Sequence, residues 1–186
     1  MKKSILLSIA AALFISAAGF GQNGSKLVSS KTQISFFSST PAEDIQAQNT
    51  ASVSTIDKSS GEVVFSVPMQ GFEFDKRLMQ KHFNQDKFLD TKTYPDAKLK
   101  AKIANLESID FGKDGSYPAT VKGELTIKGK TNPISETGTV TVKGNAVKVD
   151  SKFDVTLADY GITFAKGKPS TNIAKTVEVT VQGEYK

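Results

Sequence analysis

The sequence predicts an all-β protein: one domain of about eight antiparallel strands that curl into a barrel, with a short helical segment over one end. Three observations predict this fold class. Apolar and polar residues alternate along most of the chain, as in strands with one buried face. Clusters of Gly, Asn, Ser and Pro separate the alternating runs. A single stretch, at about 72–93, has helical spacing of its apolar residues instead.

The chain begins with a segment typical of an export signal. Lys2 and Lys3 precede an apolar run from Ile5 to Phe20, rich in Leu, Ile and Ala. A basic start followed by an apolar run of this length is typical of a secretory signal peptide. We therefore expect residues 1–22 to be a signal peptide and residues 23–186 a single barrel domain, located in the periplasm or secreted.

Charge and composition exclude several classes of protein. The formal net charge of +5 falls to +3 without Lys2 and Lys3, and basic residues are interleaved with acidic ones. Nucleic-acid binding needs a concentrated basic face, so no nucleic-acid partner is expected. No later run approaches the roughly 18 apolar residues of a spanning helix, so the mature protein is not expected to span a membrane. The chain has no Cys, which leaves neither disulfides nor thiolate metal sites.

The first half of the domain contains four expected strands. They lie at 32–38, 52–57, 62–67 and 98–106, where alternation is present but interrupted. Turn-forming residues separate them, among them Ser59, Ser60 and Gly61.

The second half alternates more regularly. Apolar or small residues alternate with charged residues and Thr at Val121, Gly123, Leu125 and Ile127. The same alternation returns at 147–157 and 177–182. Gly144-Asn145, between Val140-Val142 and Val147-Val149, is typical of a two-residue hairpin turn and predicts antiparallel neighbours. A further turn is expected over 129–133, Gly-Lys-Thr-Asn-Pro.

The apolar face of these strands requires either a second sheet or closure of one sheet on itself. Gly123, Gly138 and Ser151 lie on the apolar parity, where small residues permit sharp coiling, so closure is favoured. A barrel of about eight strands is either filled by its own side chains or holds one slender ligand. An outer-membrane barrel is disfavoured, because the chain has no Trp and its aromatic residues form no girdles.

The helical segment carries the only histidine. Phe74, Leu78, Met79, His82 and Phe83 recur at three- and four-residue spacing and are expected to share one face of a helix. The residue before Pro95 is driven out of helical conformation, so the segment must end there. We expect this segment to cap one end of the barrel.

Three sequence blocks in order resemble the YceI-like family of exported bacterial proteins, over nearly the whole mature chain. They are LMQKHFNQDKFLDTKTYPDAKL from Leu78, GELTIKGKTNPI from Gly123 and FDVTLADYGI from Phe153. The resemblance implies a lipocalin-like, eight-stranded barrel that binds a polyisoprenoid or similar amphiphile, with no established enzymatic activity. It also implies that Pro95 leads into a strand and that residues 159–162 form a bend near one rim. The polar segment 41–49 departs from the family pattern.

The candidate ligand-binding residues lie on the apolar parity of the strands and on the helical segment. They are Phe36, Phe65, Val67, Met79, His82, Phe83, Val121, Leu125, Ile127, Phe153, Val155 and Val179. The same strand residues would also fill a solid barrel, so the pattern alone leaves both interpretations open. No cofactor or metal is expected; the expected partner is a long-chain lipid, isoprenoid or quinone-like, and the oligomeric state stays open, a dimer included.

His82 has a structural and a functional interpretation. A histidine on the buried side of a helix is most often hydrogen-bonded within the structure. It could instead contact the polar end of a ligand. The leading hypothesis is a carrier or sequestering protein without chemistry. The alternatives are an enzyme acting on an amphiphile with His82 as acid or base, and a ligand-free envelope stress or interaction protein.

Overall fold

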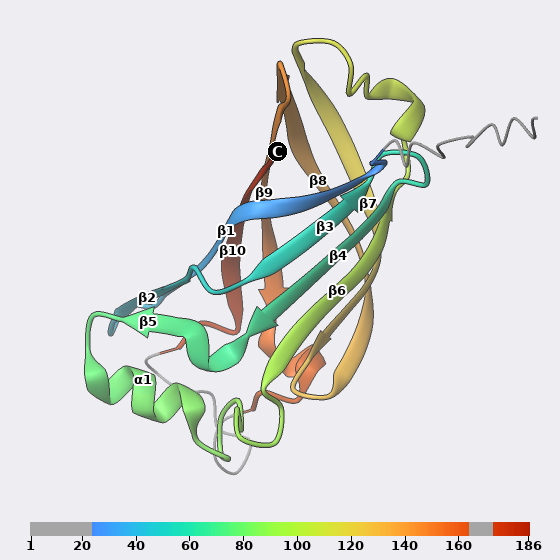
Figure 1. Cartoon of the computed structure of the whole chain (residues 1–186). Helices are drawn as coiled ribbons and strands as arrows, with labels where there is room; N and C mark the ends of the chain where they lie inside the picture. Colours follow the sequence, from blue (N-terminus) through green and yellow to red (C-terminus); the bar gives the residue numbers. More distant parts are fainter. Residues whose placement is uncertain (1–23, 164–172) are drawn as a thin grey trace, which may run out of the picture.

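A computed structural model describes residues 24–163 and 173–186, and most of them form one closed sheet (Figure 1). The barrel strands, in chain order, are β1 (Lys26–Ser39), β3 (Val53–Asp57), β4 (Glu62–Pro68), β6 (Asp96–Ile103), β7 (Gly115–Ile127), β8 (Lys130–Lys143), β9 (Ala146–Thr156) and β10 (Thr176–Tyr185). Each pairs with its neighbour in antiparallel fashion. The predicted eight-stranded antiparallel barrel is confirmed within the described residues.

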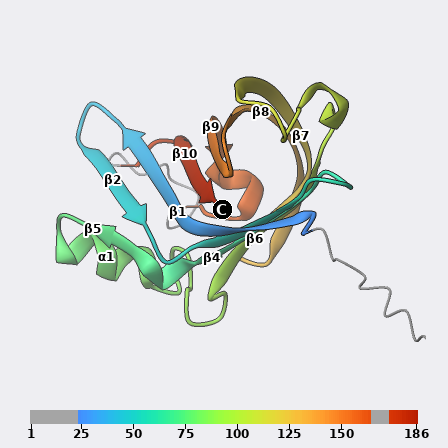
Figure 2. The ribbon, with the colours of Figure 1, turned by 45° about the horizontal axis from the view of Figure 1, so that its top comes forward.

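The barrel closes where the last strand meets the first. β10 pairs with β1 from Ser29 opposite Tyr185 to Phe37 opposite Glu178, so the ring has no free edge there (Figure 2). Closure removes the alternative of two separate stacked sheets.

A bulge in β1 reverses which residues face inward. Between Ser29 and Lys31 the pairing with β10 shifts by one residue. Before the shift Leu27 is buried and Val28 is exposed; after it, Thr32 and Ile34 are buried. An extra residue on one strand changes the side-chain parity, so β1 places both its halves against the core.

Two further strands extend the sheet beyond the ring. The first residues of β1 pair with β3, whereas Ile34 to Ser39 pair with β2 (Asp44–Asn49). β2 in turn pairs with β5 (Phe72–Phe74). The polar segment 41–49 thus supplies a strand, and β2 and β5 form a flap beside one end of the barrel (Figure 2).

The helical segment is shorter than the sequence predicts. α1 covers only Arg77–Asn84, and residues 85–95 form turns before β6 begins at Asp96. The first expected helical residues belong to β5, because Phe72 and Phe74 pair with Asn49 and Ala47 of β2. Three short 3₁₀ turns, Met69–Gly71, Leu106–Ser108 and Leu157–Tyr160, complete the described elements.

The hairpin turns explain the positions of glycine and proline in the second half. Gly144 has φ of 56° and joins β8 to β9, as predicted. The turn between β7 and β8 is tighter than expected: Lys128 and Gly129 both have positive φ, and β8 starts at Lys130. Pro133 lies within β8, where the strand pairs with β7 but no longer with β9. Proline has no N–H to donate, so it suits this unpaired edge.

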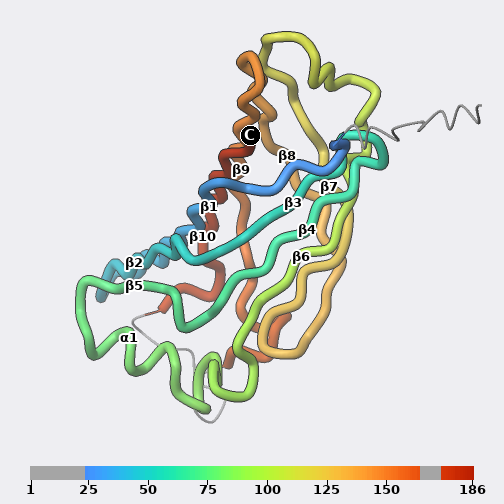
Figure 3. Tube along the Cα trace, viewed as in Figure 1, coloured from blue at the N-terminus to red at the C-terminus, as the bar shows by residue number. Residues whose placement is uncertain are grey.

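The core is densely packed at one end of the barrel and hollow at the other. Figure 3 shows α1 and the turns before β6 at the end opposite the β8–β9 hairpin. At the hairpin end Ile56, Val140, Val142 and Tyr185 are at most 2% exposed. At the α1 end the inward-facing residues surround a cavity.

Among the described residues, each helix is too short and too polar to cross a bilayer. The expected signal peptide, residues 1–22, lies outside the described residues.

Candidate functional site

The hollow end of the barrel contains an apolar cavity of about 540 Å³, whose lining includes residues of α1. Its wall comes from seven of the eight ring strands, from β2 and β5, and from α1 with the turns that follow it. Apolar side chains form most of the wall, and Ser38 is the buried polar residue among its described members. A volume of this size is typical of a small-molecule binding site.

Eleven of the twelve candidate residues lie in the cavity wall. They are Phe36, Phe65, Val67, Met79, His82, Phe83, Leu125, Ile127, Phe153, Val155 and Val179. Val121 does not line the cavity; it pairs with Ile103 and packs on the buried core. The structure brings the eleven together, and contact between them and a ligand stays a prediction.

Sequence reasoning missed several wall residues. They include Ile34, Ile45, Leu99, Ile134, Ile162, Ile173, Val177 and Val181. Val177 and Val181 share the parity of Val179, so alternation on β10 already marked them. Ile45 and Ile134 lie in runs that look polar or turn-like in sequence, where no comparable signal existed.

An aromatic cluster joins α1 to the barrel. Phe83, 7% exposed, stacks on Phe36 of β1 with ring centroids 5.8 Å apart and planes 12° from parallel. It also contacts Phe72, Phe74 and Phe88 at centroid distances of 5.5, 5.1 and 6.0 Å. Phe83 therefore fastens the helix against two strands and the following turn, and the rings form one side of the cavity mouth.

α1 turns a different side towards solvent than the sequence predicts. Leu78 is 62% exposed and His82 is also exposed, so the prediction that they pack on the buried side was wrong. α1 contacts the sheet mainly through β5 of the flap, and its inward residues are Met79 and Phe83. His82 reaches only the rim of the cavity, which does not fit a buried structural histidine.

Hydrogen bonds fix the turns that border the opening. Lys128, in the β7–β8 turn, donates from Nζ to the carbonyl oxygen of Phe88. Thr91, fully buried, donates from Oγ1 to Oδ1 of Asn84 at the end of α1, over 2.9 Å. Gly129 lies against the ring of Tyr94, with room for no side chain larger than hydrogen. The turns after α1 are thus bonded both to the β7–β8 turn and to the end of α1.

Polar groups gather at the opening. Of the polar wall residues, Glu43 is half-buried and four are exposed to solvent: His82, Gln85, Lys87 and Lys98. Lys76 at the start of α1 forms an ion pair with Glu43, at 2.8 Å, across to the β2 side. The site thus has an apolar interior and a polar rim, which suits an amphiphile with its polar end outward.

Glu136 is a carboxylate on the inward parity of the barrel that sequence reasoning did not single out. It alternates with Ile134 and Gly138 on β8 and pairs with Val121 of β7. β8 and β9 pair only as far as Gly138 and Ser151, so Glu136 lies just beyond the last paired residue. Burial, and secondarily the charge of Asp154, raises the pKa of Glu136 above its usual 4.5.

This raised pKa predicts a pH-dependent stability. The native state holds the Glu136 proton more tightly than the unfolded state, so stability falls as the pH rises from 4.5 through the native pKa. Glu136→Gln removes this loss of stability, because glutamine does not ionise. We expect the variant to unfold at higher urea concentration than the parent at neutral pH, and at the same concentration well below pH 4.5. The exposed Glu124→Gln is the control, and an equal gain there would contradict the assignment.

Among residues 24–163 and 173–186, no three His, Asp or Glu side chains converge in a geometry suited to a metal ion. His82 stands at the rim without a second histidine in the chain.

Solved structures similar to this chain share its fold. A polyisoprenoid binding domain from Saccharophagus degradans, implicated in plant cell wall breakdown, has a TM-score of 0.73 and 15% identity, over 87% of this chain and 98% of that one. BcnA of Burkholderia cenocepacia has a TM-score of 0.66 and 18% identity, over 82% and 95%. A YCEI protein of Campylobacter jejuni has a TM-score of 0.57 and 18% identity, over 73% and 80%.

Sequence comparison identifies the family. No curated protein matches the chain by sequence. The family model described as the YceI-like domain matches residues 20–185, nearly the whole chain and every strand of the barrel. The chain belongs to the YceI-like family.

Proposed function

We propose that the protein is exported and holds a long isoprenoid or similar amphiphile inside its barrel, as a carrier or sequestering protein that performs no chemistry. The apolar cavity of about 540 Å³, open at one end, is the observation that carries this proposal. Export rests on residues 1–22, whose composition is typical of a signal peptide.

Burial of the ligand's tail supplies the binding energy. Each methylene group withdrawn from water contributes about 0.8 kcal/mol, so a tail of many carbons binds tightly without directional contacts. The wall suits such a tail: Val155, Val177 and Val179 present aliphatic groups, and Phe153 adds a ring. The polar end stays near the rim, where His82 and Lys87 can reach it.

The family and its structures support the same class of ligand. The Saccharophagus degradans domain is described as polyisoprenoid binding, and its fold matches 87% of this chain. At 15% identity the likeness concerns the fold, so the ligand of that domain is a guide to the chemical class only.

Native mass spectrometry of the protein purified without organic solvent tests the proposal. We expect a bound lipid that organic extraction removes. A clean apoprotein from its own host, unable to take up prenyl lipids, would contradict it.

Two variants on β10 test whether the cavity wall, and not the outer face of the strand, holds the lipid. Val179 lines the cavity, whereas its neighbour Thr180 has the opposite parity and pairs with Lys152 and Ser35. Val179→Asp places a charge in the wall, where desolvation is costly, and is expected to abolish lipid retention. Thr180→Asp is expected to retain the lipid. Circular dichroism is the check that both variants fold. Loss of the lipid from both variants would point to a general effect of the added charge.

His82→Ala distinguishes the carrier from an enzyme. Because His82 is exposed at the rim, we expect its removal to leave the amount of retained lipid unchanged. Turnover of an added amphiphile by the parent, lost in His82→Ala, would favour the enzyme instead.

A further inference from the structure

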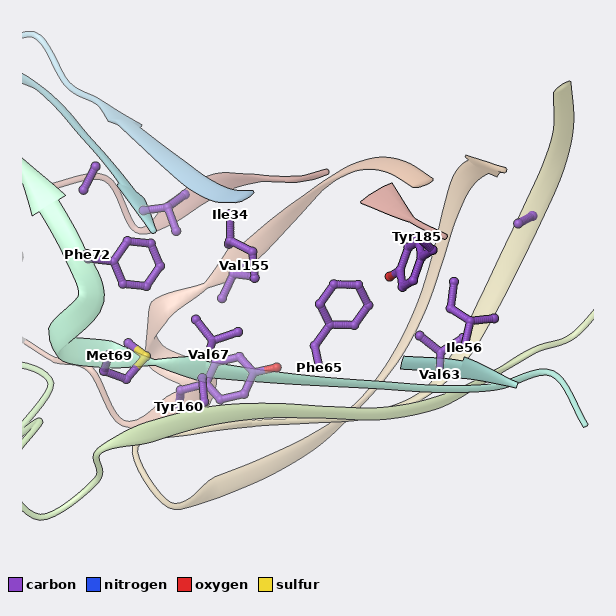
Figure 4. Close-up of a cluster of buried hydrophobic side chains, with 14 of the residues drawn as sticks. Ile34, Ile56, Val63, Phe65, Val67, Met69, Phe72, Val155, Tyr160 and Tyr185 are labelled. Atoms are coloured by element: carbon purple, nitrogen blue, oxygen red, sulfur yellow. The ribbon is translucent and has the colours of Figure 1, made fainter. Parts of the chain in front are cut away.

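The interior of the barrel is divided into two parts at Phe65. Figure 4 shows the Phe65 ring between Tyr185, Ile56 and Val63 on one side and Ile34 and Val155 on the other. Phe65, Ile34 and Val155 line the cavity, whereas Tyr185, Ile56 and Val63 do not. Phe65 is itself only 6% exposed. The ring is therefore the floor of the cavity.

Beneath the floor the barrel is filled and locked by buried hydrogen bonds. Ser54, which pairs with Phe65 across β3 and β4, bonds through Oγ to the Tyr185 hydroxyl over 2.7 Å. The same Ser54 Oγ lies 3.1 Å from Oγ1 of Thr32. All three residues are at most 2% exposed. A ligand that pushed past Phe65 would break bonds between β1, β3 and β10 and leave buried polar groups without partners.

We propose that Phe65 sets the length of tail that the barrel encloses, at about four isoprene units. A methylene group takes up about the same volume as a water molecule in the liquid, 30 Å³. A cavity of about 540 Å³ therefore holds on the order of twenty such groups. The remainder of a longer chain stays outside the mouth. This inference rests on the proposed function and adds a limit to it.

The limit predicts how affinity depends on chain length. Each unit added inside the cavity removes more apolar surface from water, so affinity rises steeply with length. Isoprene units beyond the length that Phe65 permits stay near the rim and contribute little to affinity. Affinity should therefore rise with chain length and then reach a plateau.

The experiment uses the delipidated mature protein and a series of prenyl alcohols of ten, fifteen, twenty and forty carbons. Competition against a radiolabelled twenty-carbon prenol reports relative affinity. We expect affinity to rise more than tenfold from ten to twenty carbons and to change less than threefold from twenty to forty. A continued rise to forty carbons would overturn the limit. Absence of binding at every length would instead overturn the proposed function.

Two variants move the limit in opposite directions. Phe65→Ala removes the ring from the floor and is expected to shift the plateau to longer prenols. Val67→Phe places a ring one inward position nearer the mouth on the same strand and is expected to shift it to shorter ones. The second variant keeps the proposal testable if the first does not fold. Phe37→Ala, on the outer face at 40% exposure, should leave the plateau unchanged. An unchanged plateau in both cavity variants would overturn the role of Phe65.

Discussion

Tyr185→Ala is expected to lower the free energy of unfolding by about 3 to 5 kcal/mol, the range for removal of a large buried side chain. Tyr185 is 0% exposed at the filled end of the barrel, and its strand β10 closes the ring against β1. The substitution leaves a cavity among residues that the closed sheet holds in place, so little relaxation can offset the loss. Urea unfolding followed by circular dichroism measures the change.

Milder variants separate the ring of Tyr185 from its hydroxyl group. Tyr185→Phe keeps the ring but removes one partner of Ser54, which still has Thr32 within hydrogen-bond distance. We expect a loss of about 1 kcal/mol. Phe37→Ala, on the exposed face of β1, should cost less than Tyr185→Ala. Equal effects for Phe37→Ala and Tyr185→Ala would contradict the assignment of the filled end as the stable core.

Alkaline pH provides a second readout for the same residue. Burial raises the pKa of Tyr185 to about 12, against an ordinary value of 10.0. The unfolded chain therefore loses this proton first, and stability falls as the pH rises from 10.0 towards 12. Tyr185→Phe lacks this loss, so its deficit against the parent should shrink over that range.

Phe83→Ala is expected to release α1 from the barrel. Phe83 contacts four other phenylalanine rings and is the most deeply buried residue of the helix. Truncation of a buried phenylalanine costs about 3 kcal/mol or more, which corresponds to roughly a hundredfold in an equilibrium constant. Hydrogen exchange should therefore be about a hundredfold faster for the amides of residues 77–84, if their opening is local.

Leu78→Ala is the matched control on the same helix. Leu78 is 62% exposed and lies outside the hydrophobic core cluster, so the exchange rates of the Leu78→Ala variant should stay within a few-fold of the parent. Equal acceleration in both variants would mean that helix propensity, not the aromatic cluster, holds α1 in place.

Alternation was sufficient to predict most of the barrel, because one wet and one dry face impose a period of two. It identified Phe153 and Val155 on β9 and Val179 on β10 as inward residues, and all three line the cavity. Alternation gave no guide where a bulge changes the period. The bulge at Ser29–Lys31 reverses the side-chain parity within β1, and no residue type there indicates it.

The helical segment shows a different limit of sequence reasoning. The spacing of Phe74, Leu78 and His82 predicts one buried face, yet strand pairing with β2 takes Phe74 out of the helix. Without that residue, a helix of eight residues keeps only Met79 and Phe83 inward. Tertiary pairing decides where such a short helix begins. The volume of the cavity was likewise beyond prediction, because it depends on which rows of side chains meet across the barrel.

The branching of β1 places the flap outside the strand ladders that close the barrel. Eight strands close on themselves through β10 and β1, and no bond of β2 with β5 contributes to that closure. The flap, with α1 fastened to it, is attached to the barrel through β1 and lies outside every ladder that closes the eight-stranded ring. An outward movement of the flap would separate Phe83 from Phe36 but would break no ladder of the closed barrel.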